Sequence, residues 1–149
     1  MSHDPVILAL AQQVELYRRL AKLADVQRGY VQNGQTEELL DLLVRRQAVL
    51  DEVAGLEQAI APAKRQWASY LAGLPAADRA TADAHMAETR RLLERITSAD
   101  RDDALVLQQR KLNLGRQIDQ AQAARQVNRS YAAAAYGAPK AGLDVSSRS

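Results

Sequence analysis

Apolar residues recur every three or four positions along most of the chain, and this spacing predicts helices. The first helix is predicted to begin near Asp4, a good N-cap residue, with Pro5 at its first helical position. It is predicted to end at Asn33-Gly34, because both residues tolerate the left-handed conformation that ends helices. Two adjoining apolar stripes indicate that this helix contacts more than one neighbour. They are Ile7, Leu10, Val14, Tyr17, Ala21 and Ala24, and beside them Leu16, Leu20, Leu23 and Tyr30.

A second helix is predicted to follow directly, with Thr36 as its cap and with Glu37 and Glu38 complementing its dipole. Pro62 either kinks this helix or begins a new turn, and the pattern leaves both readings open. A short helical run with Trp67, Tyr70 and Leu71 comes next, before a break between Gly73 and Pro75. The predicted core face of the second helix is Leu39, Leu42, Leu43, Val49, Leu50, Val53, Leu56 and Ile60.

A very long helix is predicted from Ala76 to about Ala135, because this stretch has no proline and only one glycine, Gly115. About 60 residues would span roughly 90 Å if the helix were unbroken. The polar run Asp100-Arg101-Asp102-Asp103 interrupts the apolar stripe, so a break near residues 98–103 is the competing reading. The stripe is Met86, Leu93, Ile96, Leu107, Leu114, Ile118 and Ala121.

Together these elements predict an all-α fold, an elongated antiparallel bundle of about three helices with a long C-terminal helix. Residues 1–136 are expected to form one helical domain, and residues 137–149 a flexible C-terminal tail with too little apolar surface to fold alone. No internal repeat is visible. Leu and Ala dominate the apolar set and Phe is absent, which favours thin helices and a narrow core.

Charge and residue usage narrow the classes of partner. Twenty Lys and Arg face eighteen Asp and Glu, which argues against nucleic acid as the main partner. Residues 1–30 are too charged for a signal peptide or a membrane span, so we expect no stable membrane insertion. The absence of cysteine excludes disulfides and fits a cytoplasmic location.

A search for catalytic chemistry finds no constellation of nucleophile, base and metal. His3 lies in the terminal segment, and His85 has no second histidine at metal-binding spacing. The aspartates at 100, 102 and 103 lack the glycine and the spaced oxygen ligands of a calcium loop. We interpret them as a solvated polar layer, and we expect no enzyme activity, no cofactor and no metal.

Two signals near the C-terminus suggest a surface for protein partners. Between Arg110 and Arg129 there are four Arg and one Lys against one Asp, a pattern that fits either a solvated helix face or a docking surface for an acidic partner. Tyr131 and Tyr136 lie in an alanine-rich stretch, where they either anchor a partner or pack against the first helix. The candidate partner-binding residues are Leu107, Leu114, Ile118, Arg125, Tyr131 and Tyr136.

The order of these features resembles the FlgN-type flagellar export chaperones over roughly residues 6 to 137. The matching residues are Glu15 and Tyr17 in the leading helix, Asn33-Gly34 before Thr36-Glu37-Glu38-Leu39, Leu50, Leu56-Glu57, Leu74-Pro75 before the long helix, and the closing Tyr136-Gly137. The alanine-rich stripe and the short tail after Gly137 depart from the family pattern.

The resemblance implies a cytoplasmic chaperone of type III flagellar export. Such a chaperone binds helical C-terminal segments of hook-filament junction proteins and delivers them to the export gate. In the family the C-terminal part of the chaperone carries these contacts, which here maps to about Leu107 to Tyr136. The alternative is a structural coiled-coil or adaptor protein that self-assembles.

Overall fold

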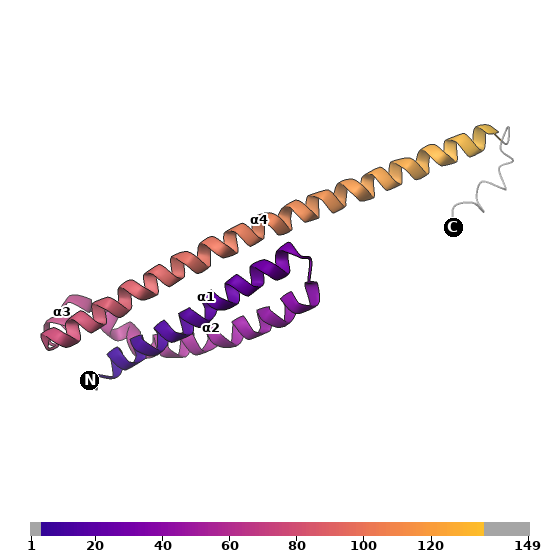
Figure 1. The fold of residues 1–149 in the computed structure, drawn as a ribbon. Coiled ribbons are helices and arrows are strands. Elements are labelled where there is room, and N and C mark those ends of the chain that lie inside the picture. The colour runs from indigo at the N-terminus through magenta and orange to yellow at the C-terminus, as the bar shows by residue number, and fades with distance from the viewer. Residues whose placement is uncertain (1–3, 136–149) are drawn as a thin grey trace. The chain divides into compact units, whose positions relative to one another are not determined.

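The computed structural model describes residues 4–135, and every regular element within them is a helix (Figure 1). The four helices are α1 (Pro5–Gln32), α2 (Thr36–Arg65), α3 (Trp67–Ala72) and α4 (Ala76–Ala135). The all-α class and the long C-terminal helix are thus confirmed. The predicted tail, residues 137–149, lies outside the described residues.

The chain divides into two units, and α4 contributes to both. Unit 1 ends at Val106 and contains α1, α2, α3 and the first part of α4. Unit 2 begins at Leu107, and its described part is the rest of α4. The division falls inside the 1–136 segment that was expected to form one domain.

The start and end of α1 follow the sequence prediction closely. The Asp4 carboxylate accepts hydrogen bonds from the backbone N–H groups of Val6 (2.9 Å) and Ile7 (3.2 Å), which are otherwise unpaired at a helix start. The Tyr70 hydroxyl of α3 donates to the same carboxylate at 2.7 Å. Burial raises the pKa of the Tyr70 hydroxyl, and the hydrogen bond to Asp4 raises it further. Gly34 ends the connection to α2 with a φ of +67°, a conformation that favours glycine.

The boundaries of α2 differ from the prediction in two details. Thr36 is the first helical residue and not the cap, and no side chain caps this end. Pro62 begins no new element, since α2 continues through it to Arg65 and ends at Gln66. Helix α4 likewise continues through residues 98–103, so the alternative of a break there is wrong.

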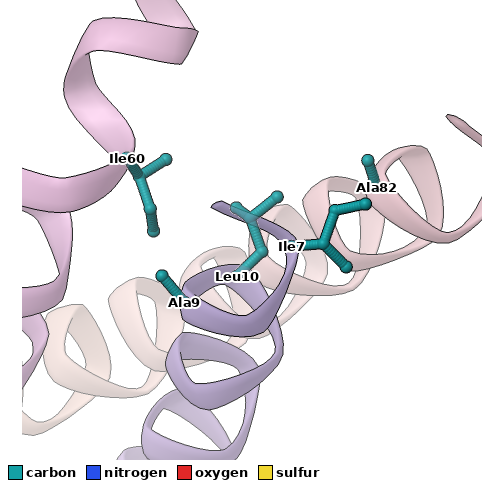
Figure 2. Packing of buried hydrophobic residues seen from close by; sticks show 5 residues of the cluster. All are labelled: Ile7, Ala9, Leu10, Ile60 and Ala82. Carbon is teal, nitrogen blue, oxygen red and sulfur yellow. The ribbon is translucent and has the colours of Figure 1, made fainter. Parts of the chain in front are cut away.

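Unit 1 is a bundle in which successive long helices run antiparallel. Gln13 of α1 bonds to Glu57 of α2, whereas the later Gln27 bonds to the earlier Arg46, so α1 and α2 run in opposite directions. Between α1 and α4 the order is preserved, because two buried clusters follow one another along both helices. The first, shown in Figure 2, is Ile7, Ala9, Leu10, Ile60 and Ala82; the second is Val14, Leu20, Ala21, Leu92 and Ile96.

Helix α1 contacts both neighbours, as its two stripes predicted. Leu10 of α1 packs in the cluster that contains Ile60 of α2, and Leu20 packs in the cluster that contains Leu92 of α4. Several of the buried positions in unit 1 are alanines, namely Ala9, Ala21, Ala24 and Ala82. Alanine contributes little buried area at each contact, so this core is narrow.

The predicted core faces of α2 and α4 are wrong at three leucines. Leu43 is 42% exposed and Leu50 is 39% exposed, while their neighbour Leu42 is fully buried. In α4 the buried residue is Leu92, and Leu93 is 40% exposed. The apolar arc of α2 is wider than one bundle contact covers, so only its inner stripe is buried.

Candidate partner-binding surface

The part of α4 in unit 2 has no buried side chain among its described residues. Every residue from Leu107 to Ala134 is exposed except Gly115, which is half-buried. Three of the exposed residues are the large apolar side chains predicted for partner binding, namely Leu107 (43% exposed), Leu114 (57%) and Ile118 (50%). Large apolar side chains on a helix gain stability by burial, so this segment is well suited to cover a partner.

The three side chains lie on one face of the helix. Successive residues turn by about 100°, so Leu107, Leu114 and Ile118 fall within an arc of roughly 40°. Ala121 extends the same line at its C-terminal end. We call these four residues the α4 stripe. With Lys111 at the position between Leu107 and Leu114, the stripe alternates by four and three residues, the spacing with which one helix packs along another.

The segment of α4 that carries the α4 stripe is basic. The segment from Leu107 to Ala135 holds five basic residues and one acidic residue, Asp119, which gives five minus one, a net charge of +4. Arg125 lies on the face of the stripe itself, and Lys111 and Arg129 both lie at its edge, as the helical turn of about 100° per residue requires. Arg125 was predicted as a partner-binding residue, and it belongs to this face.

Of the two tyrosines predicted to bind a partner, the structure describes only Tyr131. Tyr131 is 72% exposed, so it does not pack against the first helix. It lies roughly 120° around the helix from the α4 stripe, so a single partner helix on that stripe would not cover it directly. Tyr136 lies outside the described residues.

Two further exposed apolar residues in this segment escaped the sequence analysis. Leu112 is 55% exposed and Val127 is 51% exposed, and both lie on the side of the helix away from the α4 stripe. They are 15 residues apart with polar residues between them, so they form a weaker line than the α4 stripe. The sequence shows both as apolar residues, but they do not fall on the 107-114-118-121 spacing and so were not predicted.

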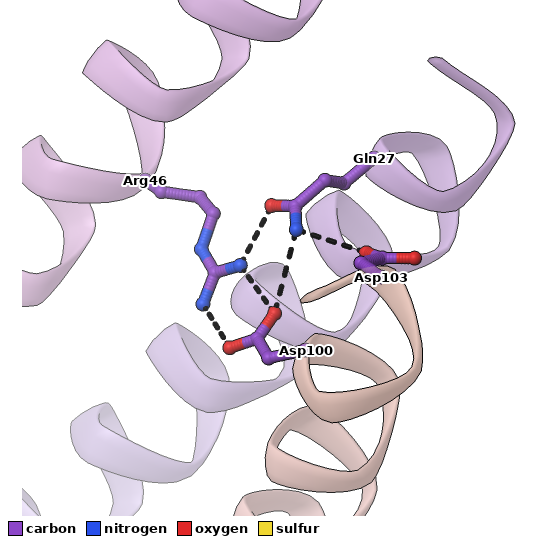
Figure 3. Close-up of polar contacts among 4 residues, drawn as sticks. All are labelled: Gln27, Arg46, Asp100 and Asp103. Carbon is purple, nitrogen blue, oxygen red and sulfur yellow. Dashed lines mark hydrogen bonds and ion pairs between the residues drawn. The ribbon is translucent and has the colours of Figure 1, made fainter. Parts of the chain in front are cut away.

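A polar network joins all three long helices near the end of unit 1 (Figure 3). Arg46 of α2 donates from both terminal nitrogens to the two carboxylate oxygens of Asp100 in α4, at 2.7 and 2.9 Å. Arg46 also donates to the side-chain oxygen of Gln27 in α1 at 2.7 Å. Gln27 in turn donates to Asp103 at 2.9 Å and to Asp100 at 3.5 Å.

This network corrects the interpretation of residues 100–103 as a solvated layer at Asp100 and Asp103, whereas Arg101 and Asp102 are exposed. Asp103 is only 3% exposed, and Asp100 is held by a two-point bond from a guanidinium. The hydrogen bond to Asp100 raises the pKa of Arg46 against the opposing effect of burial, and the charges of both aspartates add to the rise. Paired in this way, the aspartates stabilise the bundle instead of breaking α4.

Among residues 4–135 no group of three or more histidine, cysteine or acidic side chains is placed to hold a metal ion. In that same part of the chain, none of the helices has an apolar run of the length needed to cross a membrane. Comparisons of the chain with protein-family models, with curated proteins and with solved structures found no match.

Proposed function

We propose that the chain is a FlgN-type flagellar export chaperone, which acts in the cytoplasm and has no enzyme activity. Its cargo would be the helical C-terminal segments of hook-filament junction proteins, and it would deliver them to the export apparatus. The observation that carries the proposal is the exposed α4 stripe with its basic surroundings. The cargo class is taken from the resemblance to the FlgN type, which rests on the order of the helices and the breaks between them.

The α4 stripe suits a helical cargo for physical reasons. An amphipathic helix that lies along it would bury leucine and isoleucine side chains that are now in water. Basic residues beside the stripe would attract an acidic cargo and speed its encounter, an effect that added salt weakens. The chemistry of the surface therefore favours a cargo helix with one apolar face and acidic flanks.

The proposal predicts that Leu114→Asp together with Ile118→Asp weakens cargo binding at least about tenfold, because two charges would be placed on the buried side of the complex. The cargo for this test is the C-terminal segment of a hook-filament junction protein from the same organism, and titration calorimetry measures its affinity. Leu112→Asp is the matched control, since it changes an equally exposed leucine of the same helix off the stripe. If the double variant stays helical by circular dichroism and binds like the parent, the assignment is wrong.

The tyrosines are tested separately. We expect Tyr131→Ala and Tyr136→Ala to weaken either cargo binding or delivery to the export machinery. Because Tyr131 lies away from the α4 stripe, its change should spare cargo affinity more than the aspartate variants do. A secretion assay for the junction proteins measures delivery, and normal secretion by both tyrosine variants would remove these residues from the site.

A further inference from the structure

Helix α2 carries a second exposed apolar line, which lies beside its buried face. Leu40, Leu43 and Leu50 are exposed on it, and Val44 flanks it. With Gln47 and Ala54 the line follows the positions 40, 43, 47, 50 and 54, a spacing of three and four residues in turn. We call these five positions the α2 stripe. This spacing is the one that packs helices side by side, yet nothing in the described part of the chain covers the stripe.

The charge around the α2 stripe is opposite to that around the α4 stripe. Between Thr36 and Gly55 there are five acidic residues and two basic ones, which gives two minus five, a net charge of −3. One of the two basic residues, Arg46, is turned inward to Asp100. The acidic residues are Glu37, Glu38, Asp41, Asp51 and Glu52. The segment of α4 in unit 2 carries +4, so the two surfaces attract each other.

We infer that the α2 stripe binds the α4 stripe of a second copy of this chain. Both stripes follow the same alternating spacing over 15 residues, with the polar Gln47 in the middle of one and Lys111 between Leu107 and Leu114 in the other, and both leave leucines in water. Each copy offers one stripe of each kind, so two copies can bind reciprocally. The α2 stripe is an apolar face with acidic surroundings, and its partner is a basic amphipathic helix. This chain carries both surfaces.

An antiparallel arrangement of the two helices brings both their apolar positions and their charges into register. When Leu43 faces Ile118 and Leu40 faces Ala121, the alternating spacings of the two stripes coincide. The same register brings Glu37 near Arg125 and Asp51 near Lys111. The same register places Leu50 opposite Lys111, whose apolar stem can cover the leucine while its ammonium group reaches Asp51.

The α2-to-α4 contact buries a small area, so we expect the complex to dissociate readily. Each stripe extends over about four helical turns, and helix contacts of this length fall in the range below about 1,200 Å² that weak complexes bury. The dimer is therefore expected at micromolar concentrations and is expected to weaken as salt is added. Reciprocal binding would bury two such contacts.

The dimer has a consequence for the chaperone that rests on the proposed function. The second copy covers Leu114 and Ile118, which are also the residues proposed to bind cargo. Cargo and self-association then exclude each other, so an idle chaperone protects its own apolar surface until an acidic amphipathic cargo displaces the second copy.

Sedimentation velocity of the full chain over a range of concentrations tests the contact without any cargo. We expect a concentration-dependent dimer. Its dissociation constant should rise at least about tenfold in Leu40→Asp with Leu43→Asp, which face Ala121 and Ile118, and equally in Leu114→Asp with Ile118→Asp. Leu105→Asp is the control, because Leu105 is an equally exposed leucine of unit 1 that lies on neither stripe. A monomer at all concentrations in the parent would overturn the inference.

Mixing the two double variants gives the sharper result. Each variant keeps one intact stripe, so a mixture can form one α2-to-α4 contact, whereas neither variant alone can form any. We expect the mixture to form heterodimers that neither variant forms by itself. Pairing of α2 with α2, or of α4 with α4, would instead let one of the two double variants dimerise by itself without any heterodimer, and it would overturn the inference. If the parent chain forms this dimer but binds no cargo, the chaperone proposal is wrong and the inference about self-association stands.

Discussion

Neighbouring leucines of α2 differ sharply in their surroundings. Leu42 is fully buried against the other helices of unit 1, while Leu43 and Leu50 keep about two fifths of their surface in water. Burial of a leucine side chain contributes about 1.5–3 kcal/mol, and removing it from a packed core costs more because a cavity remains. The stability of unit 1 therefore depends on Leu42 and its stripe, and the exposed leucines remain available for partners.

We predict that Leu42→Ala lowers the free energy of unfolding by about 2–5 kcal/mol, the usual cost at a buried leucine. Leu50→Ala should cost about 1 kcal/mol or less, because its side chain is already partly hydrated. Urea denaturation followed by circular dichroism measures both changes. Equal losses in the two variants would contradict the burial of Leu42 and the exposure of Leu50.

The sequence predicts which positions repeat, but not which of two adjoining stripes is buried. Leu42 and Leu43 are chemically identical neighbours, so their own pattern carries no information about which one faces α1. That choice depends on the residues across the bundle, among them Asp100 and Gln27, which bond to Arg46 on the buried side of α2. The same ambiguity holds for Leu92 and Leu93 of α4, of which only Leu92 is buried.

At the scale of the helices, the Arg46 network is where α1, α2 and α4 are joined by polar bonds. The Arg46 guanidinium donates hydrogen bonds to Asp100 and Gln27, and the Gln27 amide donates one to Asp103. Buried polar groups cost stability unless they are fully paired, and here each member has partners from another helix. The network therefore fixes how these helices are aligned along one another.

We predict that Arg46→Met lowers the free energy of unfolding by about 3 kcal/mol, the lower end of the range for breaking a buried ion pair, because Asp100 is partly exposed. The triple change Arg46→Met, Asp100→Leu and Asp103→Leu should recover part of this loss, since no unpaired charge remains, although the buried Gln27 amide loses its partners. Thermal and urea denaturation of both variants measure the effect. No recovery in the triple variant would mean that the network contributes more than charge pairing.

The helices themselves were the most predictable part of the fold. Asp4-Pro5 and Asn33-Gly34 mark the ends of α1 through local chemistry, which a sequence shows directly. The aspartates at 100 and 103 were misread because their partner, Arg46, lies more than 50 residues away in the chain. Local signals fixed the elements, whereas long-range pairing decided the role of these polar residues.

At the scale of the whole molecule, the buried core and the candidate partner surface belong to different units. Both buried clusters are built from residues before Leu107, and every large residue of the α4 stripe lies in unit 2. The sequence predicted this stripe and its basic flanks, but not that the segment would have no buried side chain.

We predict that ending the chain after Gln109 keeps unit 1 folded and abolishes partner binding, because the truncation removes Leu114 and Ile118 but none of the buried clusters. Circular dichroism should show a cooperative thermal transition close to that of the full chain. Cargo titration and sedimentation should show neither a complex nor a dimer. A truncated chain that no longer unfolds cooperatively would show that unit 1 depends on the missing helix.

Helix α4 is continuous from Ala76 to Ala135, yet only its first part has side chains buried among other helices. Its backbone amides should therefore exchange with deuterium at very different rates along one helix. The hydrogen bonds from Ala82 to Ile96 open only when unit 1 unfolds, whereas those beyond Leu107 open whenever an isolated helix of this length frays. Mass spectrometry of the exchanged chain would then show a step near Val106, and the residues beyond it whose exchange slows on adding a partner would trace the footprint of that partner directly.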